Sequence, residues 1–151
     1  TAHFRSSIVA SSAPVHLAPV ASDDSMLLGT SSDDDHVYDL TKALQEVIAR
    51  DFHSHGLPVL CLRIGHIVWG KEETNLDSPI PLREFDYCRG GWVALEDVVT
   101  ACASALQIAP DVESFEVLNL VGSRTARDRF DVSKTEKRLQ MKFEYDFSNY
   151  E

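Results

Sequence analysis

The chain has 151 residues, a length typical of one domain, and its 44% hydrophobic and 25% charged content excludes a disordered protein. The formal net charge of −10 argues against a nucleic-acid-binding surface, and no run approaches the ~20 apolar residues of a membrane-spanning helix. The three cysteines form no Cys-x-x-Cys pair, and no secretory signal is recognisable. We therefore predict reduced thiols and a cytoplasmic location.

The first predicted element is a short buried strand at Ile8–Ala10, because these residues form an apolar run. Ser11 and Ser12 follow it directly. Ligands of open α/β sheets bind at the carboxyl ends of strands, so both serines are candidate site residues. A plain turn explains the same serines equally well. Residues 17–35 contain proline, glycine and many serines and aspartates, which predicts a loop whose last residue, Asp35, caps the following helix.

A helix is predicted from Val37 to His55, because apolar residues recur there at helical spacing. Tyr38 and Lys42 are four residues apart and are therefore neighbours on the helix surface, nearly opposite the apolar stripe. An ammonium group beside a phenol favours the phenolate, and such a phenol can serve as a general acid/base at neutral pH. A surface tyrosine and a solvated lysine remain the alternative for this short motif. The stripe predicted to face the core is Leu40, Ala43, Leu44, Val47 and Ile48.

The second half of the chain predicts further strands and helices. Pro58–Ile64 is nearly all apolar, as expected for a strand covered on both faces. A strand, a helix and a strand with short joins predict parallel pairing and a right-handed crossover. Residues 71–89 predict a long loop, of a length that often serves as a lid. The later expected elements are an extended piece at 92–95, a helix from Glu96, a strand at 115–121 and a helix at 131–139 with Val132 and Leu139 inward.

Several separated motifs occur in a fixed order, and together they resemble a known family. They are Ser11-Ser12-Ala13, Tyr38-x-x-x-Lys42, Leu62-Arg63-Ile64-Gly65, the segment from Trp92 to Val99, and the strand that Gly122 ends. In this order the chain resembles the second half of the extended short-chain dehydrogenase/reductase family, in its NAD-dependent epimerase/dehydratase branch. The Leu-Arg-Ile-Gly wording and the short gap to Trp92 are similar to the uronate-dehydrogenase-like members.

The resemblance implies a fold and a cofactor. The expected fold class is α/β: the C-terminal portion of a doubly wound, parallel-sheet, Rossmann-like NAD(P)-binding fold with a small substrate cap. Residues 1–151 would form one partial domain of this kind. The implied cofactor is NAD or NADP, and the implied substrate is a sugar or a sugar acid. A metal site is not expected, because the histidines show no paired ligand spacing.

The resemblance also implies a role for each matched residue. Tyr38 would be the catalytic acid/base, Lys42 would assist it and bind the nicotinamide ribose, and Ser12 would hydrogen-bond the reacting oxygen. Ser11 is the fallback for Ser12. The remaining implied contacts are Ile64 and Gly65 with the nicotinamide, His66 with the substrate, and Arg89 with an anionic substrate group, although Gly90-Gly91 displaces this arginine from its usual place.

One family feature is absent from the sequence: no G-x-x-G-x-x-G segment occurs in it. That turn lets a helix N-terminus approach the cofactor pyrophosphate. We therefore expect the glycine-rich half of the domain to be missing, so that a missing N-terminal segment or a homo-oligomer completes the sheet beside the first strand. The alternative function is a truncated, non-catalytic homologue that serves as a binding or scaffold module.

Overall fold

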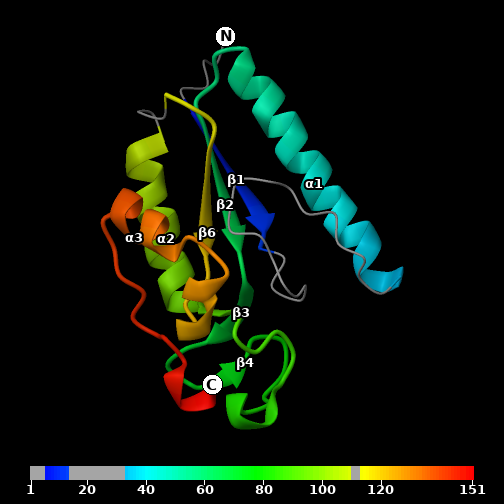
Figure 1. Cartoon of the computed structure of the whole chain (residues 1–151), viewed down its shortest axis with the longest axis vertical. Coiled ribbons are helices and arrows are strands. Elements are labelled where there is room, and N and C mark those ends of the chain that lie inside the picture. The colour runs from blue at the N-terminus through cyan, green and yellow to red at the C-terminus, as the bar shows by residue number, and fades with distance from the viewer. Residues whose placement is uncertain (1–5, 14–32, 110–112) are drawn as a thin grey trace.

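The computed structural model describes residues 6–13, 33–109 and 113–151, and its centre is a parallel sheet with helices on both faces (Figure 1). The sheet order is β1-β2-β6, formed by β1 (Ser7–Ser12), β2 (Val59–Ile64) and β6 (Glu116–Leu120). Helix α1 (Asp33–Ser54) covers one face, while α2 (Leu95–Ile108) and α3 (Val132–Leu139) cover the other. None of the described helices combines the length and the apolar character needed to cross a bilayer.

The parallel pairing of the first two strands is confirmed, and it determines where the strands end. Ser12 pairs with Ile64, and Ile64 pairs with Leu120, so the three strands finish at one edge of the sheet. The amide of Ala13 donates to the Ile64 carbonyl at 2.9 Å and extends the pairing by one residue. Side chains that leave this edge are therefore brought together from distant parts of the sequence.

The core between the sheet and α2 and α3 follows the apolar periodicity of the sequence. Leucines of β2 and β6 pack against two small residues of α2, Ala101 and Ala105, and against Leu139 of α3. Helix α3 begins where Asp131 accepts a hydrogen bond from the Lys134 amide at 2.9 Å, which is a typical N-cap. The prediction that Val132 and Leu139 point inward is confirmed, because both side chains are buried.

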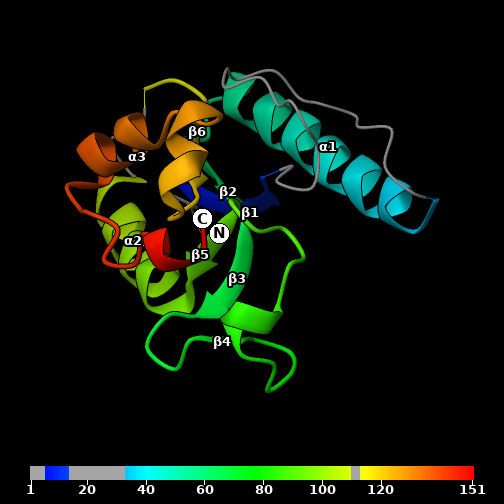
Figure 2. The same cartoon turned by 60° about the horizontal axis from the view of Figure 1, so that its bottom comes forward.

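A second, smaller sheet lies beyond the end of the parallel sheet, where the sequence predicted mainly loop (Figure 2). Its order is β4-β3-β5, formed by β3 (His66–Trp69), β4 (Thr74–Asn75) and β5 (Trp92–Ala94). The prediction of an irregular loop over 71–89 is therefore wrong in part, since this segment contains β4 and a 3₁₀ turn at Leu82–Glu84. A two-residue strand is too short to show any periodicity in the sequence.

Helix α1 differs from its prediction in both its start and its orientation. It begins at Asp33, so Asp35 lies inside the helix and does not cap it. The apolar stripe faces away from the sheet: Leu44, Val47 and Ile48 are 52%, 50% and 57% exposed. The prediction that this stripe packs inward is wrong. The buried positions of α1 are instead Asp39, Glu46 and Ala49.

The cause of this orientation is a buried ion pair between α1 and β2. The Arg63 guanidinium donates to both carboxylate oxygens of Glu46, at 2.9 and 2.8 Å, and the Ser11 hydroxyl donates to Glu46 Oε1 at 2.6 Å. Burial alone would raise the pKa of Glu46, but the hydrogen bonds from Arg63 and Ser11 outweigh it and hold the pKa below its usual value. A buried arginine needs such a partner, so the polar face of α1 turns inward.

Cys61, beside this ion pair, is expected to resist alkylation in the native protein. Burial, followed by the nearby Glu46 carboxylate, raises the pKa of its thiol to about 12, and only the thiolate is strongly nucleophilic. Iodoacetamide treatment followed by peptide mass spectrometry should label the half-buried Cys88 first and Cys61 only after unfolding in urea. Equal labelling rates for Cys61 and Cys88 in the folded chain would contradict the described packing.

Candidate active site

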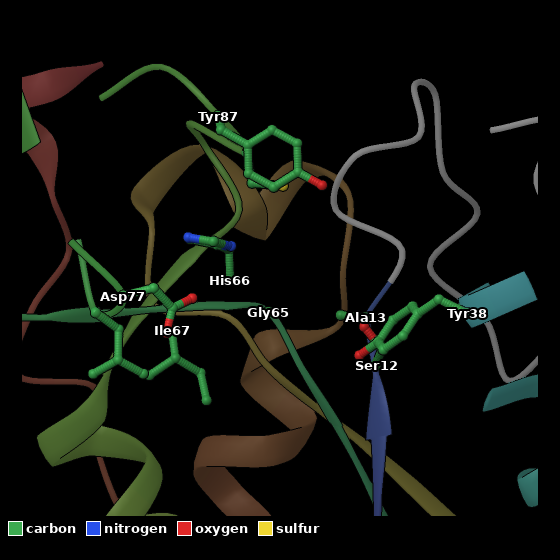
Figure 3. A pocket seen from close by; sticks show the side chains of 10 residues that line it. Ser12, Ala13, Tyr38, Gly65, His66, Ile67, Asp77 and Tyr87 are labelled. Carbon is green, nitrogen blue, oxygen red and sulfur yellow. The ribbon is translucent and has the colours of Figure 1, made fainter. Parts of the chain in front are cut away.

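A cavity of about 370 Å³ opens where the parallel sheet ends, and four of the eight predicted site residues border it (Figure 3). Its walls come from the end of β1, the start of α1, the turn between β2 and β3, and the segment 76–88. The residues that line it are Ser12, Ala13, Tyr38, Gly65, His66, Ile67, Leu76, Asp77, Tyr87 and Cys88.

The structure brings Tyr38, Lys42 and Ser12 together at the end of β1. The Tyr38 side chain reaches from α1 to the tip of β1, where it lies beside Ser12 (Figure 3). The Tyr38 side chain is 50% exposed and therefore is not part of the hydrophobic core. The Lys42 Nζ atom lies 5.5 Å from the centre of the Tyr38 ring and donates to the Ala10 carbonyl at 3.4 Å. The phenol thus has a cation beside it and an open cavity in front of it.

Ser11 and Ser12 have different environments, which separates the two candidates. Successive strand residues point to opposite faces, so only one of two adjacent serines can face α1. Ser11 is the buried one, and its hydroxyl is bonded to Glu46. Ser12 lines the cavity. Ser12 therefore remains the candidate for contact with the reacting oxygen, while Ser11 anchors α1.

The two residues predicted to face the nicotinamide are also separated by the structure. Gly65 lines the cavity, and its amide donates to the Leu120 carbonyl at 2.9 Å. Ile64, one residue earlier, is half-buried and packs against the leucine core of the sheet, and it is not among the residues that line the cavity. Of the two residues, Gly65 is the one that borders the cavity.

Gly65→Ala is expected to destabilise the fold, because a Cβ atom at this position would lie 2.5 Å from the Gly91 carbonyl oxygen. Neither backbone segment can easily move aside, because the Gly91 oxygen accepts a hydrogen bond from the His66 amide at 3.1 Å and the Gly65 amide donates to Leu120 at 2.9 Å. Forcing a methyl group into such a space typically costs ~1–3 kcal/mol. Thermal unfolding followed by circular dichroism measures the effect, and an unchanged midpoint would contradict the close approach.

His66 lies on the cavity wall within a group of aromatic rings. Its ring stacks on Phe85 and meets the edge of Tyr87, with ring centres 5.3 Å apart in each pair. Its Nε2 atom lies 3.1 Å from Asn75 Oδ1, and the Asn75 amide nitrogen donates to Ser78 at 3.0 Å. His66 is thus held at the cavity by side chains of the segment 75–87.

Arg89 is not among the residues that line the cavity. Its Nη2 atom lies 2.6 Å from the Asp86 carboxylate, and its guanidinium lies over the Trp92 ring at 5.7 Å. Three lining residues with polar side-chain atoms, Asp77, Tyr87 and Cys88, were not predicted as site residues. They belong to the long segment 71–89, and no feature of its sequence distinguishes these three positions from the others.

Comparison with known proteins gives matches among solved structures, whereas no family model and no curated protein matches the sequence significantly. The PbgP3 protein from Burkholderia pseudomallei matches with a TM-score of 0.63 and 13% identity, over 95% of this chain and 56% of that one. A UDP-N-acetylglucosamine 4-epimerase from Bacillus cereus matches with a TM-score of 0.54 and 18% identity, over 93% of this chain and 58% of that one.

The chain shares their fold. The predicted α/β class, part of a doubly wound parallel-sheet fold, is thereby confirmed, and the resemblance predicted from the motifs is confirmed at the level of fold. The chain spans less than three fifths of the length of each of these structures.

Proposed function

We propose that the chain carries the acid/base half of an NAD(P)-dependent oxidoreductase or epimerase that acts on a sugar or sugar acid. The observation that supports this most strongly is that Tyr38 and Ser12 line one open cavity while Lys42 lies beside the Tyr38 ring. In this proposal Tyr38 exchanges a proton with the reacting hydroxyl or carbonyl, and Ser12 hydrogen-bonds the same oxygen. Lys42 places a positive charge beside the phenol, with its Nζ atom 5.5 Å from the ring centre.

The residues present fit one end of a nicotinamide dinucleotide. Lys42 lies beside Tyr38, which lines the cavity, and Gly65 offers a wall without a side chain, so these two would hold the ribose and the nicotinamide. When bound, the nicotinamide supplies the hydride acceptor or donor. The sequence contains no glycine-rich turn for the pyrophosphate.

The test is an assay of NAD and NADP reduction by the chain, with uronates and nucleotide sugars as candidate substrates. The proposal predicts reduction of the nicotinamide that depends on Tyr38. Activity that persists unchanged in the Tyr38→Phe variant would reject the mechanism, whatever the substrate.

A second candidate function is a binding or scaffold module without catalysis, and the absent glycine turn favours it. Calorimetric titration of the 151-residue chain with NAD and with NADP separates the two functions. Micromolar binding by this chain alone would count against the non-catalytic alternative.

We further propose that additional polypeptide pairs with β1 and extends the sheet. This polypeptide would be either another segment of the protein or a second copy of the chain. Among the described residues, β1 is an edge strand whose pairing is with β2 alone. Helix α1, whose apolar stripe is exposed, packs beside β1 (Figure 2). An uncovered edge beside an apolar helix face is a typical site of association.

A further inference from the structure

We propose, building on the proposed function, that the cavity selects an uncharged, hydroxyl-rich sugar ring and discriminates against a sugar acid. Three features of the described cavity carry this inference: the Asp77 carboxylate opposite Tyr38 accepts hydrogen bonds, no lysine or arginine is among the described residues that line the cavity, and an aromatic side chain forms the rim. The inference narrows the substrate class, which the family resemblance leaves open between sugars and sugar acids.

The first feature is the hydrogen-bonding character of the wall opposite Tyr38. His66, on this wall, is held by Asn75: Asn75 Oδ1 can only accept, so His66 Nε2 donates to it at 3.1 Å. Asp77, on the same wall, presents a carboxylate, which accepts hydrogen bonds (Figure 3). Sugar hydroxyls can donate to this carboxylate. An ionised substrate carboxylate has no proton to donate and would be repelled by Asp77.

The second feature is the placement of the basic side chains near the site. Arg89 is paired with Asp86, and Lys42 lies over the Tyr38 ring and donates to the Ala10 carbonyl. Neither residue is among the described residues that line the cavity. A carboxylate-bearing substrate would therefore find no charged partner among these lining residues.

The third feature is the aromatic rim. Tyr87 is 52% exposed at the cavity mouth, and the His66 ring meets it at an interplanar angle of 83°. Phe85 stacks on His66 and also lies beside Tyr87, with the Phe85 and Tyr87 ring centres 6.4 Å apart. An aromatic side chain held in this way offers an apolar surface to the C–H groups of a sugar ring, while its hydroxyl stays polar. The rim therefore suits a ring-shaped, hydroxylated ligand.

The test is calorimetric titration of the full chain, without any dinucleotide, with UDP-glucose and with UDP-glucuronate. These ligands share the nucleotide and differ at one carbon, which bears a hydroxyl in one and a carboxylate in the other; free UDP measures the nucleotide contribution. We expect UDP-glucose to bind about tenfold more tightly than UDP-glucuronate, as a like-charge contact near a surface predicts. Asp77→Asn should reduce that ratio to below about threefold, and Tyr87→Ala should weaken both ligands.

Asp51→Asn, at the far end of α1, is the matched control, because it removes the same charge from an exposed site and should leave the ratio unchanged. Equal or tighter binding of UDP-glucuronate would overturn the inference. So would affinities for both sugars equal to that for UDP alone, or an absence of binding by the folded chain. Because no hydride transfer is measured, each of these results leaves the Tyr38 mechanism to be judged by its own assay.

Discussion

Tyr38→Phe is expected to lower the rate of nicotinamide reduction by ~10²–10⁴-fold, the range typical for loss of a positioned acid/base. The substitution removes one oxygen atom and keeps the ring beside Lys42 and the tip of β1. Because the ring is half exposed, the free energy of unfolding should change little. Steady-state rates at saturating substrate, together with a thermal unfolding curve, measure the two effects separately.

Tyr87→Phe is the matched control for this variant, because it removes the same atom from another tyrosine of the same cavity. In the proposed function Tyr87 contacts the substrate and transfers no proton, so its effect should appear in KM, with kcat nearly unchanged. Equal losses of kcat in the two variants would show that Tyr38 has no special role in proton transfer.

The meeting of Ser12 and Tyr38 could be predicted from sequence because it depends on local and regular features. Apolar runs mark β1 and β2, helical spacing marks α1, and a strand–helix–strand unit has one favoured handedness. Parallel strands then end at a common edge, so Ser12 at the end of β1 and Tyr38 near the start of α1 approach each other. Two segments 26 residues apart thus converge without any long-range information.

The orientation of α1 could not be predicted in the same way, because a long-range pair determines it. Periodicity identifies the apolar stripe but does not show which face the sheet will cover. Glu46 and Arg63 are 17 residues apart, and nothing local to either residue indicates that they meet in the interior. The outcome also depends on the edge of β1, beside which the apolar stripe is left exposed.

The presence of Asp77 and Tyr87 at the cavity could not be predicted from the sequence for a related reason. Both belong to the segment between β3 and β5, which is held by a two-residue strand and by single contacts such as the bond from His66 to Asn75. Single contacts of this kind leave no periodic pattern of residues in the sequence. The side chains to which we assign the selection of the sugar are therefore the ones least visible in the sequence.

Glu46→Ala is expected to destabilise the protein by ~3–5 kcal/mol, a large share of the ~5–15 kcal/mol that stabilises a typical domain. The reason is that the substitution leaves the Arg63 guanidinium buried without its carboxylate partner, and it removes the acceptor for Ser11 as well. Urea unfolding followed by circular dichroism measures the loss. Glu84→Ala is the control, since the Arg83–Glu84 pair is exposed and should contribute less than ~1 kcal/mol.

The double variant Glu46→Met with Arg63→Met separates the cost of an unpaired charge from the worth of the pair. Replacing both partners by apolar side chains should recover most of the stability lost in Glu46→Ala, because no uncompensated charge then remains.

The pH dependence of stability gives a second test of the pair. The pKa of Glu46 lies below its usual value in the folded state, so the stability that Glu46 contributes is present at neutral pH and is lost as the pH falls from the unfolded pKa through the folded pKa. The double variant should therefore lose less stability than the wild type on acidification. A double variant as unstable as Glu46→Ala would mean that Ser11 and the position of α1 depend on the carboxylate itself, and not on charge balance.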